Sequence, residues 1–119
     1  MNRLLICGAA LGLISVIMGA VGDHAFHLSP EHMKGYETAV RYNMFYALLI
    51  VVLSFQKEKS FVAAGTIFSV GIVLFSFSIY AARITGIESL TYITPVGGLT
   101  FMAGWTWLII SEIFKLKRT

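Results

Sequence analysis

The sequence predicts an all-α integral membrane protein, a four-helix bundle with short loops. Of its 119 residues, 57% are hydrophobic and 13% are charged. This hydrophobic share exceeds that of ordinary soluble domains, and the mean hydropathy is +0.80. The basic residues flank apolar segments and form no patch of the kind that binds nucleic acid. We expect a single transmembrane domain over residues 1–119, with spans at about residues 4–22, 36–55, 61–84 and 95–114, each near the roughly 20 residues that a crossing helix needs.

The first span carries no charge and has small residues at a spacing of 4, 3, 4 and 3. On a helix these positions form one face: Gly8, Gly12, Ser15, Gly19 and Gly22. Such a face lets a neighbouring helix backbone approach closely within lipid. We therefore expect the first helix to be the packing centre of a left-handed bundle that closes around it.

The second span follows a polar connection and has a polar outer half. Ser29-Pro30-Glu31 predicts a helix start, because serine caps free amides, proline suits the first turn and an acid suits the positive end of the dipole. Glu37 and Arg41 are four residues apart in the acid-first order, so they can pair on one helix face.

The third and fourth spans carry their own polar and small residues. Ser69, Ser76 and Arg83 recur at intervals of seven along the third span, and a loop is expected over residues 85–94. Pro95 opens the fourth span, where a first-turn proline is tolerated. Gly97, Thr100 and Gly104 give that span a small face, which we expect to dock against the first helix. Trp105, beside Gly104, is expected to pack between helices and to need an acceptor for its indole N–H.

Basic residues predict the orientation of the bundle. They gather at both termini and in the connection between the second and third spans: Arg3, Lys57, Lys59, Lys115, Lys117 and Arg118. By the positive-inside rule both termini face the cytoplasm. The protein is therefore expected in the bacterial cytoplasmic (inner) membrane as a multi-pass protein.

Several motifs resemble one known family over nearly the whole chain. They are Gly19-Ala20-Val21-Gly22-Asp23-His24, Val40-Arg41-Tyr42-Asn43, Leu74-Phe75-Ser76-Phe77-Ser78-Ile79-Tyr80, Ile93-Thr94-Pro95-Val96-Gly97-Gly98 and Ala103-Gly104-Trp105. In order and spacing they resemble the domain of unknown function family 423, small bacterial four-helix membrane proteins with eukaryotic relatives. The resemblance implies a topology and an inner-membrane location but no reaction. Asp23, Tyr46 and Phe77 stand where that family usually has alanine, histidine and glycine.

Polar residues are predicted to meet at the outer end of the bundle. The predicted ligand or ion-pair cluster is Asp23, His24, Glu37, Arg41, Ser76, Tyr80 and Arg83. Arg41 would lie on the order of 7 to 9 Å inside the outer boundary, where a lone charge is costly, so it needs Glu37 or Asp23 as a partner. Two interpretations stay open: a structural network that ties helix ends together, or a pocket for a small anion, lipid headgroup or cation.

The chemistry-bearing residues predict neither catalysis nor a cofactor. His24, His27 and His32 with Asp23 have ligand types that suit zinc, but nothing in their spacing defines a geometry, and we expect no metal site. No His-Glu-x-x-His or Gly-x-Ser-x-Gly motif is present. The expected role is a non-enzymatic accessory or structural protein that lies in the lipid bilayer and acts through helix contacts with itself, as a homo-oligomer, or with other membrane proteins. The alternative is a small transporter, channel or ligand-binding protein that uses the outer cluster.

Overall fold

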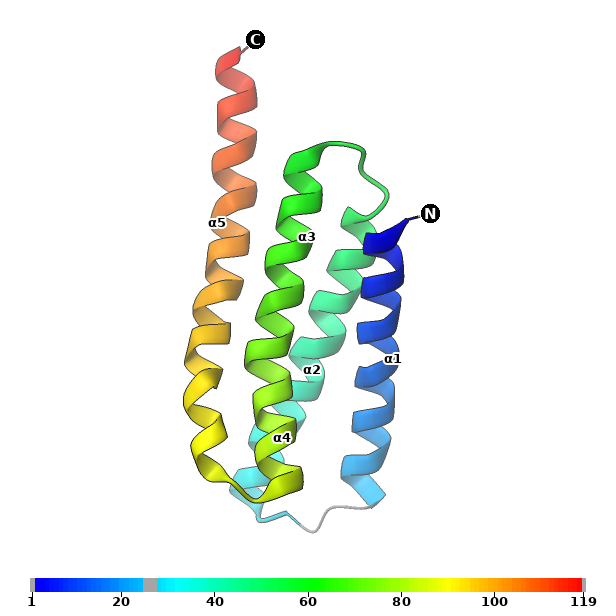
Figure 1. Ribbon diagram of the computed structural model, residues 1–119, viewed down its shortest axis with the longest axis vertical. Coiled ribbons are helices and arrows are strands. Elements are labelled where there is room, and N and C mark those ends of the chain that lie inside the picture. The colour runs from blue at the N-terminus through cyan, green and yellow to red at the C-terminus, as the bar shows by residue number, and fades with distance from the viewer. Residues whose placement is uncertain (1, 25–27, 119) are drawn as a thin grey trace.

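The chain folds into four helical rods that run up and down beside one another (Figure 1). The computed structural model describes residues 2–24 and 28–118, except for the side chains of residues 23, 24 and 116–118. No strand occurs in these ranges, and the predicted all-α fold class is confirmed. The elements are α1 (Arg3–His24), α2 (Pro30–Leu53), α3 (Lys59–Ile72), the π-helical η1 (Val73–Phe77), α4 (Ser78–Thr85), the 3₁₀ helix η2 (Glu88–Ile93) and α5 (Thr94–Arg118).

The start of α2 is formed as the sequence predicts. The backbone N–H of His32 donates to Ser29 Oγ at 3.3 Å, and Pro30 occupies the first turn, where its missing N–H costs nothing. The helix then continues without a break to Leu53.

Two helical segments depart from the prediction. Residues 73–77 form a π-helical turn between α3 and α4 instead of regular α-helix. The predicted loop over residues 85–94 contains the 3₁₀ helix η2. It follows Gly86, whose left-handed φ of 76° ends α4. The Thr91 hydroxyl then closes the short helix by donating to the Glu88 carbonyl at 2.7 Å.

The centre of the bundle lies between α2, α3 and α5 and is filled by aromatic rings. Tyr46 of α2 stacks on Phe101 of α5 with ring centroids 3.9 Å apart, and Phe68 of α3 lies 5.2 Å from the same tyrosine ring. These three residues belong to one buried cluster with Leu11, Ala47, Ile50, Leu53, Ala64 and Ile72.

The small-residue face of α1 lies against α2 along its length. A Cβ atom added at Gly8 would lie 2.9 Å from a methyl group of Val51, and one added at Gly12 would lie 3.8 Å from Ala47. Farther along, Ser15 Oγ donates to the Val40 carbonyl at 2.9 Å. The contact therefore reaches from one end of the two helices to the other.

The expectation that the bundle closes around α1 is wrong, because α1 lies at one edge and α5 at the opposite edge (Figure 1). The small face of α5 docks on the rod formed by α3 and η1. A Cβ at Gly97 would lie 2.6 Å from the Phe75 Cα, and the Phe68 ring covers Gly104. The reason is steric: α1 has no aromatic side chain with which to fill a space between several helices.

Within the described residues, three helical stretches are long and apolar enough to cross a membrane, namely Arg3–Gly22, Lys59–Thr85 and Glu88–Lys115. The second predicted span is not among them, since Glu37, Arg41 and Asn43 lower the hydropathy of α2. Nevertheless α2 packs against α1 from Val51 beside Gly8 to Tyr36 beside Gly22. It therefore passes through the same depth as α1.

Candidate functional site

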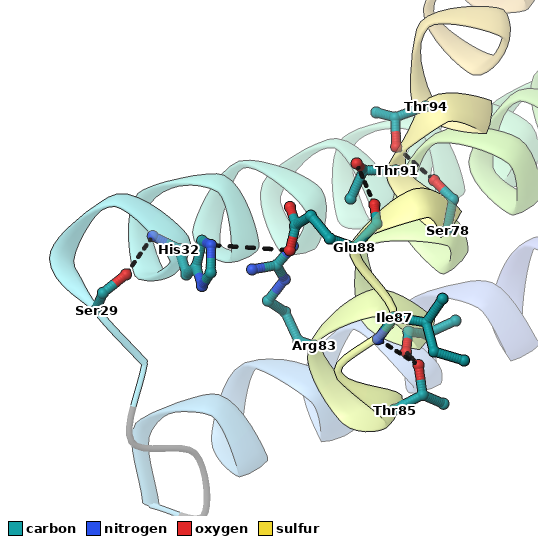
Figure 2. A network of polar contacts seen from close by, with 10 residues as sticks. Ser29, His32, Ser78, Arg83, Thr85, Ile87, Glu88, Thr91 and Thr94 are labelled. Atoms are coloured by element: carbon teal, nitrogen blue, oxygen red, sulfur yellow. Dashed lines mark hydrogen bonds and ion pairs between the residues drawn. The ribbon is translucent and has the colours of Figure 1, made fainter.

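Charged groups meet where α2 begins and α4 ends, which we call the polar end of the bundle (Figure 2). The Arg83 side chain is only 6% exposed, and its Nη2 donates to both carboxylate oxygens of Glu88 at 2.8 Å. His32 of α2 places Nε2 3.9 Å from the same carboxylate. The Glu88 carboxylate thereby links α4, η2 and α2.

A cavity of about 360 Å³ lies beside this ion pair. Its lining residues come from α2, α4, η2 and the start of α5: Glu31, His32, Gly35, Ile79, Arg83, Glu88, Thr91, Thr94 and Pro95. The Arg83 Nε atom is buried and has no hydrogen-bond partner in the described part of the chain. A buried donor without a partner is costly.

The floor of the polar end is tied to α5 by two hydroxyl groups. Ser78 Oγ and Thr94 Oγ1 share a hydrogen bond of 2.6 Å (Figure 2), and Ser78 also lies 2.9 Å from the Phe75 carbonyl, to which it donates. These bonds fix the first residue of α5 against the first residue of α4.

A second polar layer is buried deeper, between α1, α2 and α4. Tyr80 donates to Asn43 Oδ1 at 3.0 Å, and Asn43 Nδ2 donates to the Leu11 carbonyl at 3.0 Å. Ser76 donates to the Ala39 carbonyl at 2.7 Å. Ser76 and Tyr80, two members of the predicted cluster, therefore hold helices together and do not line the cavity.

Glu37 and Arg41 are both exposed and lie apart from Arg83. They line a separate hollow of about 280 Å³ on the side of α2 that faces Gly19. No ion pair joins them in the described residues, since an exposed pair at this spacing is worth only about 0.2–0.5 kcal/mol and does not immobilise the side chains. The structure thus divides the described members of the predicted cluster among three places: the polar end, the deeper buried layer and this hollow.

Asp23 and His24 end α1, but their side chains lie outside the described residues, as does His27. The predicted partnership of Asp23 with Arg41 falls there too. Within the part of the chain that is described, no three His, Cys, Asp or Glu residues come close enough together to hold a metal ion.

Sequence reasoning missed Glu88 and Ser78 as members of the polar network. One signal was available for Glu88: it follows Arg83 by five residues, across the glycine turn at Gly86. Asn43 was expected among the polar residues of the second helix, but its partners, the Leu11 carbonyl and the Tyr80 hydroxyl, are distant in sequence and were not predicted.

Trp105 has the hydrogen-bond acceptor that its indole N–H was expected to need, the Tyr46 hydroxyl. The indole Nε1 donates to the Tyr46 hydroxyl at 2.9 Å, which joins α5 to α2. Tyr46 stands where the resembled family often has histidine, and here the residue packs within the aromatic core. Trp107 donates to the Ser60 carbonyl at 2.9 Å, at the opposite end of the bundle.

Comparison with known proteins identifies chains that are similar over nearly their whole length. A family model described as "Protein of unknown function (DUF423)" matches residues 18–98. The UPF0382 membrane protein SH2409 of Staphylococcus haemolyticus is 38% identical over 93% of this chain and 95% of its own. The UPF0382 membrane protein YwdK of Bacillus subtilis is 33% identical, over 95% and 98%. The UPF0382 inner membrane protein YgdD of Escherichia coli K12 is 31% identical, over 97% and 92%. No solved structure matches the chain.

Proposed function

The chain belongs to the DUF423 family of membrane proteins of unknown function, and we propose that it is a non-enzymatic accessory protein. It acts through helix contacts with itself or with other membrane proteins. Its relatives are named membrane or inner membrane proteins, and the chain itself is a multi-pass protein of the bacterial inner membrane.

The observation that supports this proposal is that α1 and α5, at the two edges of the bundle, are largely uncovered. Only 17% of the most apolar stretch of α1 is buried, and the same share of the η2–α5 rod, against 39% for the α3–α4 rod. Leu13 on α1 and Met102 on α5 are 61% and 64% exposed. Two edges that each pack on one side only are available for lateral association in lipid, where close side-chain packing drives helix contacts.

The interior of the bundle supports contact over translocation. The polar side chains of its buried layer, Asn43, Tyr80 and Ser76, are paired with one another or with carbonyl groups. Its centre is filled by stacked rings, including Tyr46 on Phe101. A transport path needs polar groups that a passing substrate can reach, and these groups are already committed to helix packing.

The test is cross-linking in native membranes followed by extraction in a mild amphiphile. A photoreactive residue replaces Leu13 on the α1 edge or Met102 on the α5 edge, and a matched control replaces Ile72, which is fully buried in α3. We expect stoichiometric adducts with a second copy or another membrane protein from the edge positions and none from Ile72. A particle that holds one chain, with no adduct from either edge, overturns the proposal.

We further propose that both termini face the cytoplasm. The basic residues at the N-terminus and in the α2–α3 connection, Arg3, Lys57 and Lys59, lie on the side opposite the polar end, which fits the positive-inside rule. Labelling of single cysteines in a Cys7→Ser background tests the orientation: a membrane-impermeant reagent applied to spheroplasts should modify Tyr92→Cys in η2 but not Lys57→Cys. The reverse pattern overturns it.

A second candidate function, binding of a small anion at the polar end, is favoured by Arg83. Its Nε has no hydrogen-bond partner among the described residues, and its side chain is buried beside the 360 Å³ cavity. In this role a carboxylate or phosphate would compete with Glu88 for the guanidinium. Saturable anion binding by the purified protein that is lost in Arg83→Gln supports this role, and equal binding by both proteins excludes it.

A further inference from the structure

We infer that the exposed face of α2 around Arg41 is a binding site for one phospholipid, with phosphatidylethanolamine as the preferred headgroup. The site lies apart from the cavity at Arg83 and adjoins the α1 and α5 edges for which protein contacts are proposed.

Arg41 lies at the meeting point of three surface hollows. One is the 280 Å³ hollow that also holds Glu37. The second, about 560 Å³, runs between α1 and α2 and is lined by Val16, Ala20 and Leu48. The third, about 330 Å³, lies toward α5 and is lined by Tyr46 and Trp105.

Phe45 divides the two apolar hollows. It lies one turn after Arg41 on the same face of α2, lines both hollows and is 57% exposed. A cation above a ridge with an apolar hollow on each side matches a phospholipid, whose phosphate carries two acyl chains. In this arrangement the chains lie on either side of the phenyl ring.

The depth of Arg41 favours an anionic partner, and no ion pair to a described side chain supplies one. Arg41 follows His32 at the polar end by nine residues, or about 13 Å of helix, and its side chain is exposed. Helical side chains point toward the helix N-terminus, so the guanidinium reaches back toward the headgroup region. Glu37 is not within ion-pair distance among the described residues, and a lipid phosphate supplies the missing charge.

Glu37 determines the headgroup preference. It lies one turn before Arg41, on the side of the polar end, and lines the same hollow. A phosphate held at Arg41 places an ethanolamine ammonium within reach of the Glu37 carboxylate. A glycerol headgroup has no cation to offer there, and a second anion would be repelled.

The test is native mass spectrometry of the purified full-length protein, titrated with dioleoyl phosphatidylethanolamine or dioleoyl phosphatidylglycerol. We expect one saturable ethanolamine lipid on the wild type. Arg41→Gln should weaken it roughly tenfold, the change that the loss of one charge-assisted hydrogen bond produces. Glu37→Gln should remove the preference between the two lipids while retaining binding. Lys34→Gln, at an exposed cation on the same helix, is the matched control and should behave as the wild type.

A second variant separates the chain-binding hollows from the charge. Ala20→Trp fills the hollow between α1 and α2 from an exposed position and should also displace the lipid, whatever the fate of Arg41→Gln. Soluble phosphoethanolamine should compete poorly, because it lacks acyl chains. Equal lipid binding by wild type, Arg41→Gln and Ala20→Trp overturns the inference, as does full displacement by soluble phosphoethanolamine.

Discussion

The Tyr80 hydroxyl donates a 3.0 Å hydrogen bond to Asn43 Oδ1 in the buried interior, and so links α4 to α2. Asn43 is fully buried and passes the connection on to α1 through the Leu11 carbonyl. Three helices are joined by one side-chain amide, which makes this pair more informative about stability than any surface charge.

Tyr80→Phe should lower the stability of the bundle by about 0.6–1 kcal/mol, because it removes the hydroxyl and leaves the Asn43 oxygen without its donor. Asn43→Leu should cost more, since it breaks the links to both α4 and α1. Thermal unfolding in detergent, followed by circular dichroism, measures both. Tyr92→Phe is the control, because Tyr92 is 81% exposed; a loss as large in that variant would contradict the role given to Asn43.

Gly8→Ala should destabilise the α1–α2 contact by about 1–3 kcal/mol, the usual cost of overpacking. The added methyl would meet Val51 at 2.9 Å and its backbone nitrogen at 3.1 Å, so α2 would have to move. Gly35→Ala is the matched change, since nothing lies within 4 Å of a Cβ there, and it should stabilise α2 by up to about 1 kcal/mol. Equal effects of the two substitutions on the unfolding temperature would be inconsistent with a tight α1–α2 seam.

Tyr46→Phe should cost about 1 kcal/mol and change the environment of Trp105, because the indole N–H loses its acceptor while the ring stack on Phe101 stays in place. Fluorescence of Trp105 in a Trp107→Phe background reports the change directly. An unaltered emission spectrum together with an unaltered unfolding temperature would mean that the indole bond does not form in the membrane.

Glu88→Gln should destabilise the polar end by about 1–2 kcal/mol, because it leaves the Arg83 guanidinium, only 6% exposed, without its carboxylate. Glu88 itself is 64% exposed, and the screening of its charge keeps the figure modest. His32→Gln removes only the 3.9 Å contact and serves as control. Hydrogen exchange of η2 amides should rise in Glu88→Gln and stay unchanged in His32→Gln.

Composition and length were sufficient to predict the all-α membrane fold, and local capping rules predicted the start of α2 at Ser29 and Pro30. The partner of each small face could not be predicted. A glycine face predicts that another helix approaches closely. The identity of that helix depends on where the large rings of Phe68, Tyr46 and Phe101 fit. For that reason the first helix was expected at the centre and lies at an edge.

The candidate site was predictable only where the contacting residues are close together in the sequence. Ser76 and Tyr80 were identified as polar residues of one helix, but their partners Ala39 and Asn43 lie 37 residues earlier in the chain. The separation of Arg41 from Arg83 was equally hidden. It depends on which faces α2 and α4 present to each other, and helical periodicity alone does not determine that.

The π-helical turn at Val73–Phe77 puts the two halves of one rod out of phase. A π turn accommodates one extra residue, so every side chain after it is rotated by about 100° relative to an uninterrupted α-helix. Residues seven apart therefore contact different neighbours. Ser69 Oγ lies 3.4 Å from Cys7 Sγ of α1, Ser76 donates to α2, and Arg83 pairs with Glu88 of η2. Deleting a single residue within the turn would restore the regular phase and swing Arg83 away from Glu88, so the position of the Arg83–Glu88 pair depends on the length of this short stretch.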